Sequence, residues 1–214
     1  TGALANQRSQ RQSMGLQGGA ATQNFQKRLD DYEENRHFLM GQYFRTNYNK
    51  TMRNLPQVNT QVQIQRVEVW VTNRNGANTD ARDIVGFMDL AEPAPYNPVI
   101  SSFTSNPLPF NGANSLYSSL VNDPNARNPA MINSLLFARG LRPVDDYEKT
   151  FARKLTPNEY YFNPQAGFVS VNSQLQADEV LAVAYQYTYN GKVYQVGEFS
   201  QDVALDSTKG VQKV

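Results

Sequence analysis

His37 is the only histidine of the chain and the side chain best suited to acid–base chemistry, because imidazole titrates near neutral pH. A catalytic triad would also need a positioned nucleophile and an orienting carboxylate, and no Ser nucleophile motif accompanies His37. The chain has no cysteine, which excludes a thiolate nucleophile, a disulfide and a thiolate metal site. We therefore expect His37 to have a surface or capping role.

Paired acids are the next candidates for catalysis. They occur at Asp30-Asp31, Glu33-Glu34 and Asp145-Asp146. Adjacent residues point in different directions on a helix and to opposite faces on a strand, so neither arrangement makes a catalytic dyad. These pairs are typical of solvated charge.

The polar loop from residue 73 to residue 80 places oxygen-bearing side chains at nearly alternating positions, loosely like a calcium loop. The candidate ligands are Asn73, Asn75, Asn78 and Asp80, of which only Asp80 is charged, and no bidentate Glu follows at the required distance. Turn chemistry explains such asparagines. Gly18-Gly19 follows no strand and belongs to no phosphate-binding motif. We expect no metal, no cofactor and no enzymatic activity.

The amino-acid composition limits the classes of partner that the chain could bind. Of the 214 residues, 40% are hydrophobic and 18% are charged, and the net charge is only +1. This balance is typical of a globular domain and argues against a nucleic-acid partner, which would require concentrated Lys and Arg. The chain opens at Thr1 without an initiator Met or a signal-peptide segment, and we expect a segment of a longer polypeptide.

An amphipathic helix is predicted from Asn35 to Leu55. One apolar stripe recurs at the helical period, Asn35 is suited to the N-cap, and Pro56 would end the helix. The stripe consists of Met40, Phe44, Tyr48, Met52 and Leu55. Two short helices are expected near residues 116–120 and 128–140, after an irregular, proline-rich connection at about 92–114.

Alternating patterns predict strands at VEVWV, DIVGFMDL and GFVSV, with a bulge near Arg66 and an antiparallel pairing of the first two. VLAVAYQYTYNGKVYQVGEF predicts a hairpin that turns at Asn190-Gly191. Its register places Tyr187 opposite Tyr194 and Tyr185 opposite Val196. The resulting aromatic face favours packing into a core or onto a partner.

Three long segments resemble a known family. They are YFRTNYNKTMRNLPQVNTQVQIQRVEVWVTN, ARDIVGFMDL and LTPNEYYFNPQAGFVSVNSQLQADEVLAVAYQYTYNGKVYQVGEF. Together they resemble SprA, also called Sov, the very large outer-membrane translocon of the type IX secretion system of Bacteroidetes, first linked to gliding motility.

The resemblance implies a part in protein export at the outer membrane, with this segment in the periplasm or at the cell surface. It also implies partners: a PorV-like shuttle, a periplasmic plug, secreted cargo and the rest of the parent chain. It implies no enzymatic residues. A barrel wall would show repeated strands of about ten residues, so a domain outside the lipid is the better interpretation.

The sequence thus predicts an α+β fold, a long amphipathic helix on an antiparallel sheet with a C-terminal hairpin and long irregular connections. We expect a low-complexity arm at 1–34, one domain at 35–205 and a polar, frayed tail at 206–214. The candidate partner contacts are Trp70, Tyr185, Tyr187 and Tyr194. Two alternatives stay open: a surface glycan-binding module that uses exposed aromatic rings, and a hydrolase with dispersed Asp and Glu across a cleft.

Overall fold

The computed structural model describes residues 26–74, 81–203 and 210–214. The chain divides into two units, residues 1–32 and 33–214. In the first unit, the described residues contain one 3-10 helix, Leu29–Asp31. The second unit holds all the elements that follow.

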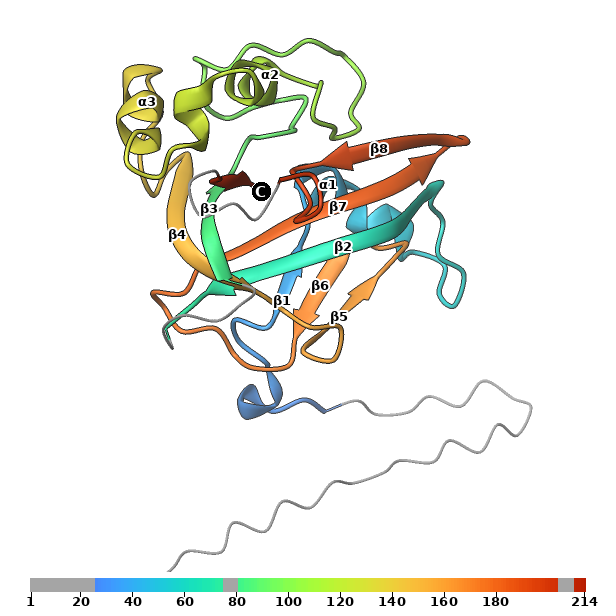
Figure 1. Ribbon diagram of the computed structural model, residues 1–214. Coiled ribbons are helices and arrows are strands. Elements are labelled where there is room, and N and C mark those ends of the chain that lie inside the picture. The colour runs from blue at the N-terminus through green and yellow to red at the C-terminus, as the bar shows by residue number, and fades with distance from the viewer. Residues whose placement is uncertain (1–25, 75–80, 204–209) are drawn as a thin grey trace, which may run out of the picture. The chain divides into compact units, whose positions relative to one another are not determined.

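A curled six-stranded sheet forms the centre of this unit, in the order β8-β7-β2-β4-β3-β9 (Figure 1). Only β3 and β9 run parallel to each other. The sheet curls so that its two edge strands, β8 and β9, approach each other. The amide of Glu198, just after β8, donates to the carbonyl of Lys213 in β9 at 2.8 Å. The strands are β2 (Val62–Thr72), β3 (Ala81–Phe87), β4 (Tyr147–Lys154), β7 (Leu181–Tyr189), β8 (Lys192–Val196) and β9 (Gln212–Lys213).

A smaller antiparallel sheet, β1-β6-β5, packs with helix α1 (Gln42–Thr51) against the side chains of β2 and β7. Its strands are β1 (His37–Leu39), β5 (Tyr160–Asn163) and β6 (Phe168–Val171). Phe44 of α1 lies over Gly167, where a Cβ would collide with the Phe44 ring and where φ is +68°. Both constraints favour glycine there.

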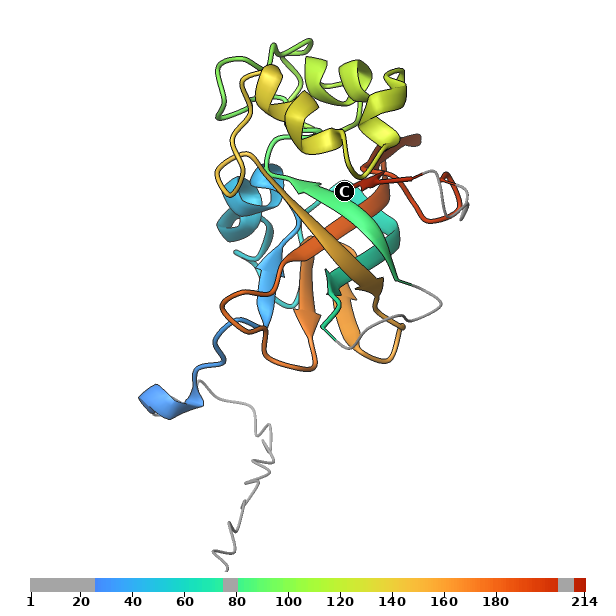
Figure 2. The same cartoon turned by 60° about the vertical axis from the view of Figure 1, so that its left-hand side comes forward.

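Short helices form the opposite layer, at the top of both views (Figures 1 and 2). They are α2 (Ser115–Val121), the 3-10 turn η2 (Pro124–Arg127) and α3 (Ile132–Ala138). Their apolar residues, such as Leu120, Ile132 and Leu136, pack with Val85 and Tyr147 of β3 and β4 in a second core. By the strand registers, Val71 of the first core and Val85 of the second lie on the same face of the six-stranded sheet. A third core, which includes Trp70, Ile84 and Phe199, lies on the other face.

The predicted α+β fold with a long amphipathic helix is wrong. The described part of the chain is mostly β, with 33% of its residues in strands, 17% in helices and three short helices. Asn35 has φ +52° rather than an N-cap conformation, and residues 37–39 pair with β6. Backbone pairing with a distant strand, which no local periodicity reports, overrides the helical stripe over its first turns.

Other parts of the prediction are confirmed. The hairpin turns at Asn190-Gly191, with φ of +49° and +73°, in the predicted register. The register of β2 shifts between Ile64 and Arg66, at the predicted bulge. The proposed pairing of β2 with β3 is wrong, because β3 pairs with β4 and β9.

The predicted polar tail contributes a strand, because Gln212 and Lys213 pair with β3 and are fully buried. The predicted Asn75-Gly76 turn, most of the candidate calcium loop and most of the N-terminal arm lie outside the described residues. The division into arm, domain and tail stays a prediction.

Candidate functional site

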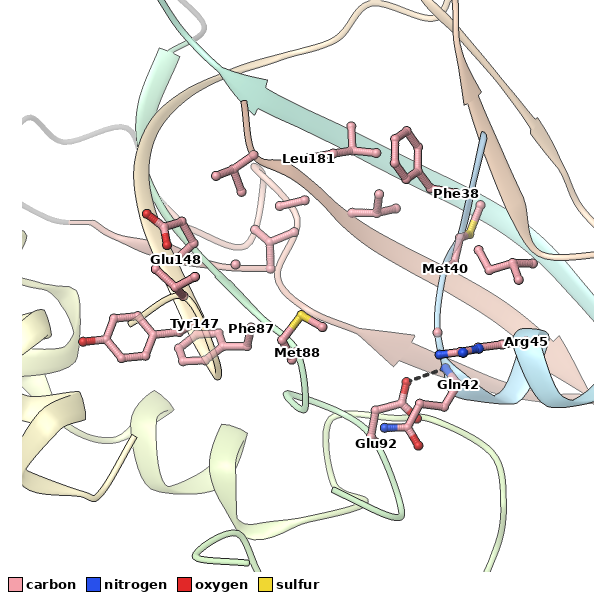
Figure 3. Close-up of a pocket in the computed structure, with 18 of the residues that line it drawn as sticks. Phe38, Met40, Gln42, Arg45, Phe87, Met88, Glu92, Tyr147, Glu148 and Leu181 are labelled. Atoms are coloured by element: carbon pink, nitrogen blue, oxygen red, sulfur yellow. Dashed lines mark hydrogen bonds between the residues drawn. The ribbon is translucent and has the colours of Figure 1, made fainter. Parts of the chain in front are cut away.

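An apolar groove of about 530 Å³ opens between the two sheets of the second unit (Figure 3). Residues 38–42, from β1 to the start of α1, form one wall, and residues 86–88 at the end of β3, with Tyr147 and Glu148 of β4, form the other. The first residues of β7, Leu181 to Val183, also line it. This volume falls in the range of sites that bind small molecules or short peptide segments.

Two strands that border the groove are incompletely paired. β1 is an edge strand of the smaller sheet, with β6 as its one neighbour. β8 pairs with β7 only from Tyr185 onward, so residues 181–184 pair with β2 and with no second strand within the described residues, although Gly86 of β3 lies close to Ala182. Consecutive residues of both strands line the groove, and the groove therefore runs along backbone edges as well as side chains.

Exposed apolar side chains surround the groove. Met88 is 64% exposed, Tyr96 69% and Val144 80%, and all three line it. Val144 has φ +72°, a conformation that costs a β-branched residue free energy, and its amide donates to the Tyr147 carbonyl at 2.9 Å. Such a cluster of exposed apolar groups is typical of a contact surface.

Four charged residues line the groove, and two of them are engaged locally. Oε1 of Glu92 accepts the Gln42 amide at 3.0 Å, and Oε1 of Glu179 lies 3.4 Å from Nε of Arg74. Arg45 and Glu148 have no ion-pair partner among the described residues. In Figure 3 these two residues lie at opposite sides of the groove, with apolar side chains between them.

Glu92 explains how α1 begins. The residue before the helix is Gly41, which has no side chain to cap it, and the Glu92 carboxylate takes over the capping bond at the positive end of the helix. Burial raises the pKa of the Glu92 carboxyl, the hydrogen bond from Gln42 opposes this, and nearby Asp89 raises the pKa further. The role of this acid is therefore structural.

The alternative of a hydrolase would need two free carboxylates across an open groove. Within the described lining, Glu92 and Glu179 are held by local contacts. The two remaining charged residues are one acid, Glu148, and one base, Arg45. The side-chain amide Nε2 of Gln42 is buried there without a hydrogen-bond partner. This arrangement is suited to holding a polar ligand group.

Three of the four candidate contact residues are buried in the chain's own interior. Trp70 and Tyr185 are 1% exposed and Tyr187 is 0% exposed, whereas Tyr194 is half-buried. Trp70 lies in the core formed with Ile84 and Phe199. Whether any of the four contacts a partner stays a prediction.

The proline-rich connection and α1 cover the aromatic face of the hairpin. The Tyr187 hydroxyl donates to the Pro109 carbonyl at 2.7 Å, and Phe110 packs edge-on against Tyr194 with centroids 5.8 Å apart. Phe44 of α1 contacts Tyr185 in the same way at 5.9 Å. The long loop thus has a packing role that its composition alone did not indicate.

His37 has neighbours that sequence reasoning missed. Its Nδ1 lies 2.7 Å from Ser170 Oγ, and its Nε2 lies 2.8 Å from Glu33 Oε2. The pairing of His37 with Ser170 across β1 and β6 brings these side chains together. The contact could be predicted from the sequence only by predicting that strand pairing. A triad acts in a water-excluded site with preorganised oxyanion donors, whereas the side chains of His37 and Glu33 are each 50% exposed.

A buried charge cluster lies on the helical side of the large sheet, and we call it the Glu198 cluster. The Glu198 carboxylate is bound at 2.6 Å by both terminal nitrogens of Arg127, and it also accepts the Lys213 amide at 3.0 Å. Tyr117 donates to it at 3.4 Å. The cluster joins α2, η2, the end of the hairpin and β9.

Burial within the Glu198 cluster perturbs two further groups. Desolvation raises the pKa of Tyr117 to about 12, with Glu198 adding to the effect. Desolvation lowers the pKa of Lys213 to about 8, although Glu198 opposes this. Lys213 Nζ is buried without a hydrogen-bond partner within the described residues.

Residues 26–74, 81–203 and 210–214 contain no group of three or more His, Asp or Glu side chains placed to hold a metal ion. None of the helices in the same ranges has the length and apolar character needed to cross a bilayer.

The fold and the groove together define a mostly β, two-sheet domain with short helices on one face and a partly open apolar groove. Residues 2–87 match the model of the N-terminal region of SprA, described as a motility related/secretion protein, and this match supports an N-terminal fragment of the SprA family. The resemblance is thereby confirmed. The similar stretch at 155–199 lies outside the matched residues, and no curated protein matches the chain.

Proposed function

We propose that this domain is a non-enzymatic interaction module of an outer-membrane translocon that serves protein secretion and gliding motility. The observation that carries this proposal is the family match over residues 2–87, to a motility related/secretion protein. The groove supports it, because exposed apolar groups beside unpaired strand edges suit binding to other polypeptides.

The proposed partners are other components of the type IX secretion system, namely a PorV-like shuttle and a periplasmic plug, together with secreted cargo and the rest of the parent chain. The proposed location is outside the lipid of the outer membrane, in the periplasm or at the cell surface. Both rest on the resemblance to SprA.

The absence of enzymatic activity belongs to the proposal and is tested at Ser170, the sole nucleophile hydrogen-bonded to His37 within the described residues. The purified chain should neither hydrolyse p-nitrophenyl acetate faster than a Ser170→Ala variant nor react with a fluorophosphonate probe at Ser170. Specific labelling of Ser170 would contradict this part of the proposal.

The secretion role is tested in cells. Deleting residues 33–214 from the parent protein should reduce export of secreted cargo and gliding, while Ser170→Ala should leave both unchanged. Normal export after the deletion would exclude the secretion role, and loss of export with Ser170→Ala would favour an enzyme.

The alternative of a glycan-binding module loses support from the burial of its proposed stacking rings. Trp70, Tyr185 and Tyr187 expose 1% or less of their surface, and a stacking platform must present a ring face to the sugar. A glycan array probed with the purified chain should show no binding.

A further inference from the structure

The groove is the feature for which the chain itself provides no occupant within the described residues. Its walls include the outer edge of β1 and the part of β7 that β8 does not reach. An unpaired strand edge presents amide and carbonyl groups that another extended chain can bind. The backbone around the groove therefore favours a polypeptide in extended conformation over a globular or helical ligand.

The centre of the groove selects apolar side chains. Phe38, Met40, Met88 and Leu181 line it, and Figure 3 places them between the two charged ends. Burying apolar surface contributes about 25 cal/mol per Å². A segment with several consecutive branched aliphatic residues would gain from this burial and would also favour the extended conformation.

The two ends of the groove favour charged ligand groups of opposite sign. Arg45 at one end and Glu148 at the other have no ion-pair partner among the described residues, whereas the other two lining acids, Glu92 and Glu179, are engaged. Gln42 also lines the groove, and its side-chain amide Nε2 is buried without a hydrogen-bond partner among the described residues. A complementary ligand carries an acid at the Arg45 end and a base at the Glu148 end.

We propose that the groove binds a short extended segment of another polypeptide, aliphatic in its centre, with an acidic residue at the Arg45 end and a basic residue at the Glu148 end. The segment adds its backbone to the free strand edges. This inference rests on the proposed function, since it specifies the chemistry of one partner of the interaction module.

Two capped hexapeptides of opposite order test the proposal, Lys-Val-Thr-Ile-Val-Asp and Asp-Val-Thr-Ile-Val-Lys, each titrated into the full 214-residue chain by fluorescence anisotropy. One order should bind at least tenfold more tightly than the other and than a version with Gln at both ends. Equal binding of the two orders, or binding of neither, would overturn the proposal.

A charge exchange in the protein is the decisive variant. Arg45→Glu combined with Glu148→Arg should invert the preference between the two peptides, a result that a folding defect could not produce. The matched control is Lys50→Glu combined with Asp145→Lys, which makes the same charge changes at exposed residues outside the groove lining and should keep the wild-type preference. An unchanged preference in the groove variant would contradict the assignment of the charges.

The backbone contribution is tested with the preferred peptide N-methylated at alternate residues. Loss of binding for one methylation pattern and not the other is expected for pairing with a strand edge. Equal affinity of both methylated peptides would exclude strand addition.

Other occupants give different results. A second copy of the chain would appear as a dimer in sedimentation velocity that the Arg45→Glu and Glu148→Arg exchange dissociates. A lipid would appear as binding to phosphatidylglycerol vesicles that competes with the peptide. Either result would overturn the proposal without touching the secretion phenotype, which the deletion of residues 33–214 tests separately.

Discussion

The Glu198 cluster and the groove both combine charged and apolar side chains, but they differ in how the charges are satisfied. In the cluster, Glu198 is 2% exposed, and hydrogen bonds reach both of its carboxylate oxygens. In the groove, Arg45 and Glu148 have no ion-pair partner among the described residues.

The difference indicates a division of roles. A buried charge without its partner is costly, so the groups in the Glu198 cluster depend on one another and hold the closing edge of the large sheet to the helical layer. Partly exposed charges beside an apolar surface cost little alone and are available to a ligand. The cluster therefore governs stability, and the groove governs binding.

The largest effect is expected at Arg127. Arg127→Met leaves the Glu198 carboxylate buried and unpaired, and should lower the free energy of unfolding by about 3–5 kcal/mol in urea titrations. The double variant Arg127→Met with Glu198→Met should lose less free energy of unfolding than the single variant, because it also removes the unpaired carboxylate. A single variant as stable as the wild type would show that the cluster does not govern stability.

The lowered pKa of Lys213 predicts how the free energy of unfolding depends on pH. Its pKa of about 8 in the folded chain lies below the ordinary lysine value of 10.5, so between these pH values the unfolded chain binds more protons than the folded chain. The free energy of unfolding should therefore rise with pH from 8 to 10, by about 2 kcal/mol at most.

Tyrosines with raised pKa values, such as Tyr117, act in the opposite direction above about pH 10, which limits the useful range for this test. Lys213→Met should remove the rise, as measured by urea midpoints at pH 7.5, 8.5 and 9.5. The same pH slope in wild type and variant would assign the effect to another group.

A smaller effect of opposite sign is expected at the edge of the groove. Val144 combines a φ of +72° with 80% exposure, so Val144→Asn should relieve backbone strain and raise the free energy of unfolding by about 1 kcal/mol. Val144→Ala is the control, because it removes apolar surface and keeps most of the strain. Destabilisation by Val144→Asn would show that the strain is not stored there.

The sequence predicted those elements whose cause is local. The hairpin of β7 and β8 follows from alternation and from Asn190-Gly191, and the bulge in β2 follows from the phase change near Arg66. Both signals lie within a few residues of the feature that they produce. The short helices also carry local start and stop signals, such as Gly140 with φ +83° after α3.

The groove could not be predicted, because its parts are separated in sequence. Arg45 and Glu148 are brought to one groove only by the pairing of β3 with β4 and by the docking of β1 on β6. Because a helix was predicted from Asn35, β1 was not predicted. The free strand edge of β1 and the contact of His37 with Ser170 were therefore missed as well. The aromatic residues, by contrast, were easy to find from composition but serve the core.

The most direct test of this account is cargo export by cells whose parent protein carries Arg45→Glu with Glu148→Arg. The account predicts that export falls at least fivefold while the protein stays at wild-type abundance, and that the matched Lys50→Glu with Asp145→Lys variant exports normally. Normal export by the groove variant would contradict the claim that this groove is the domain's binding site in secretion.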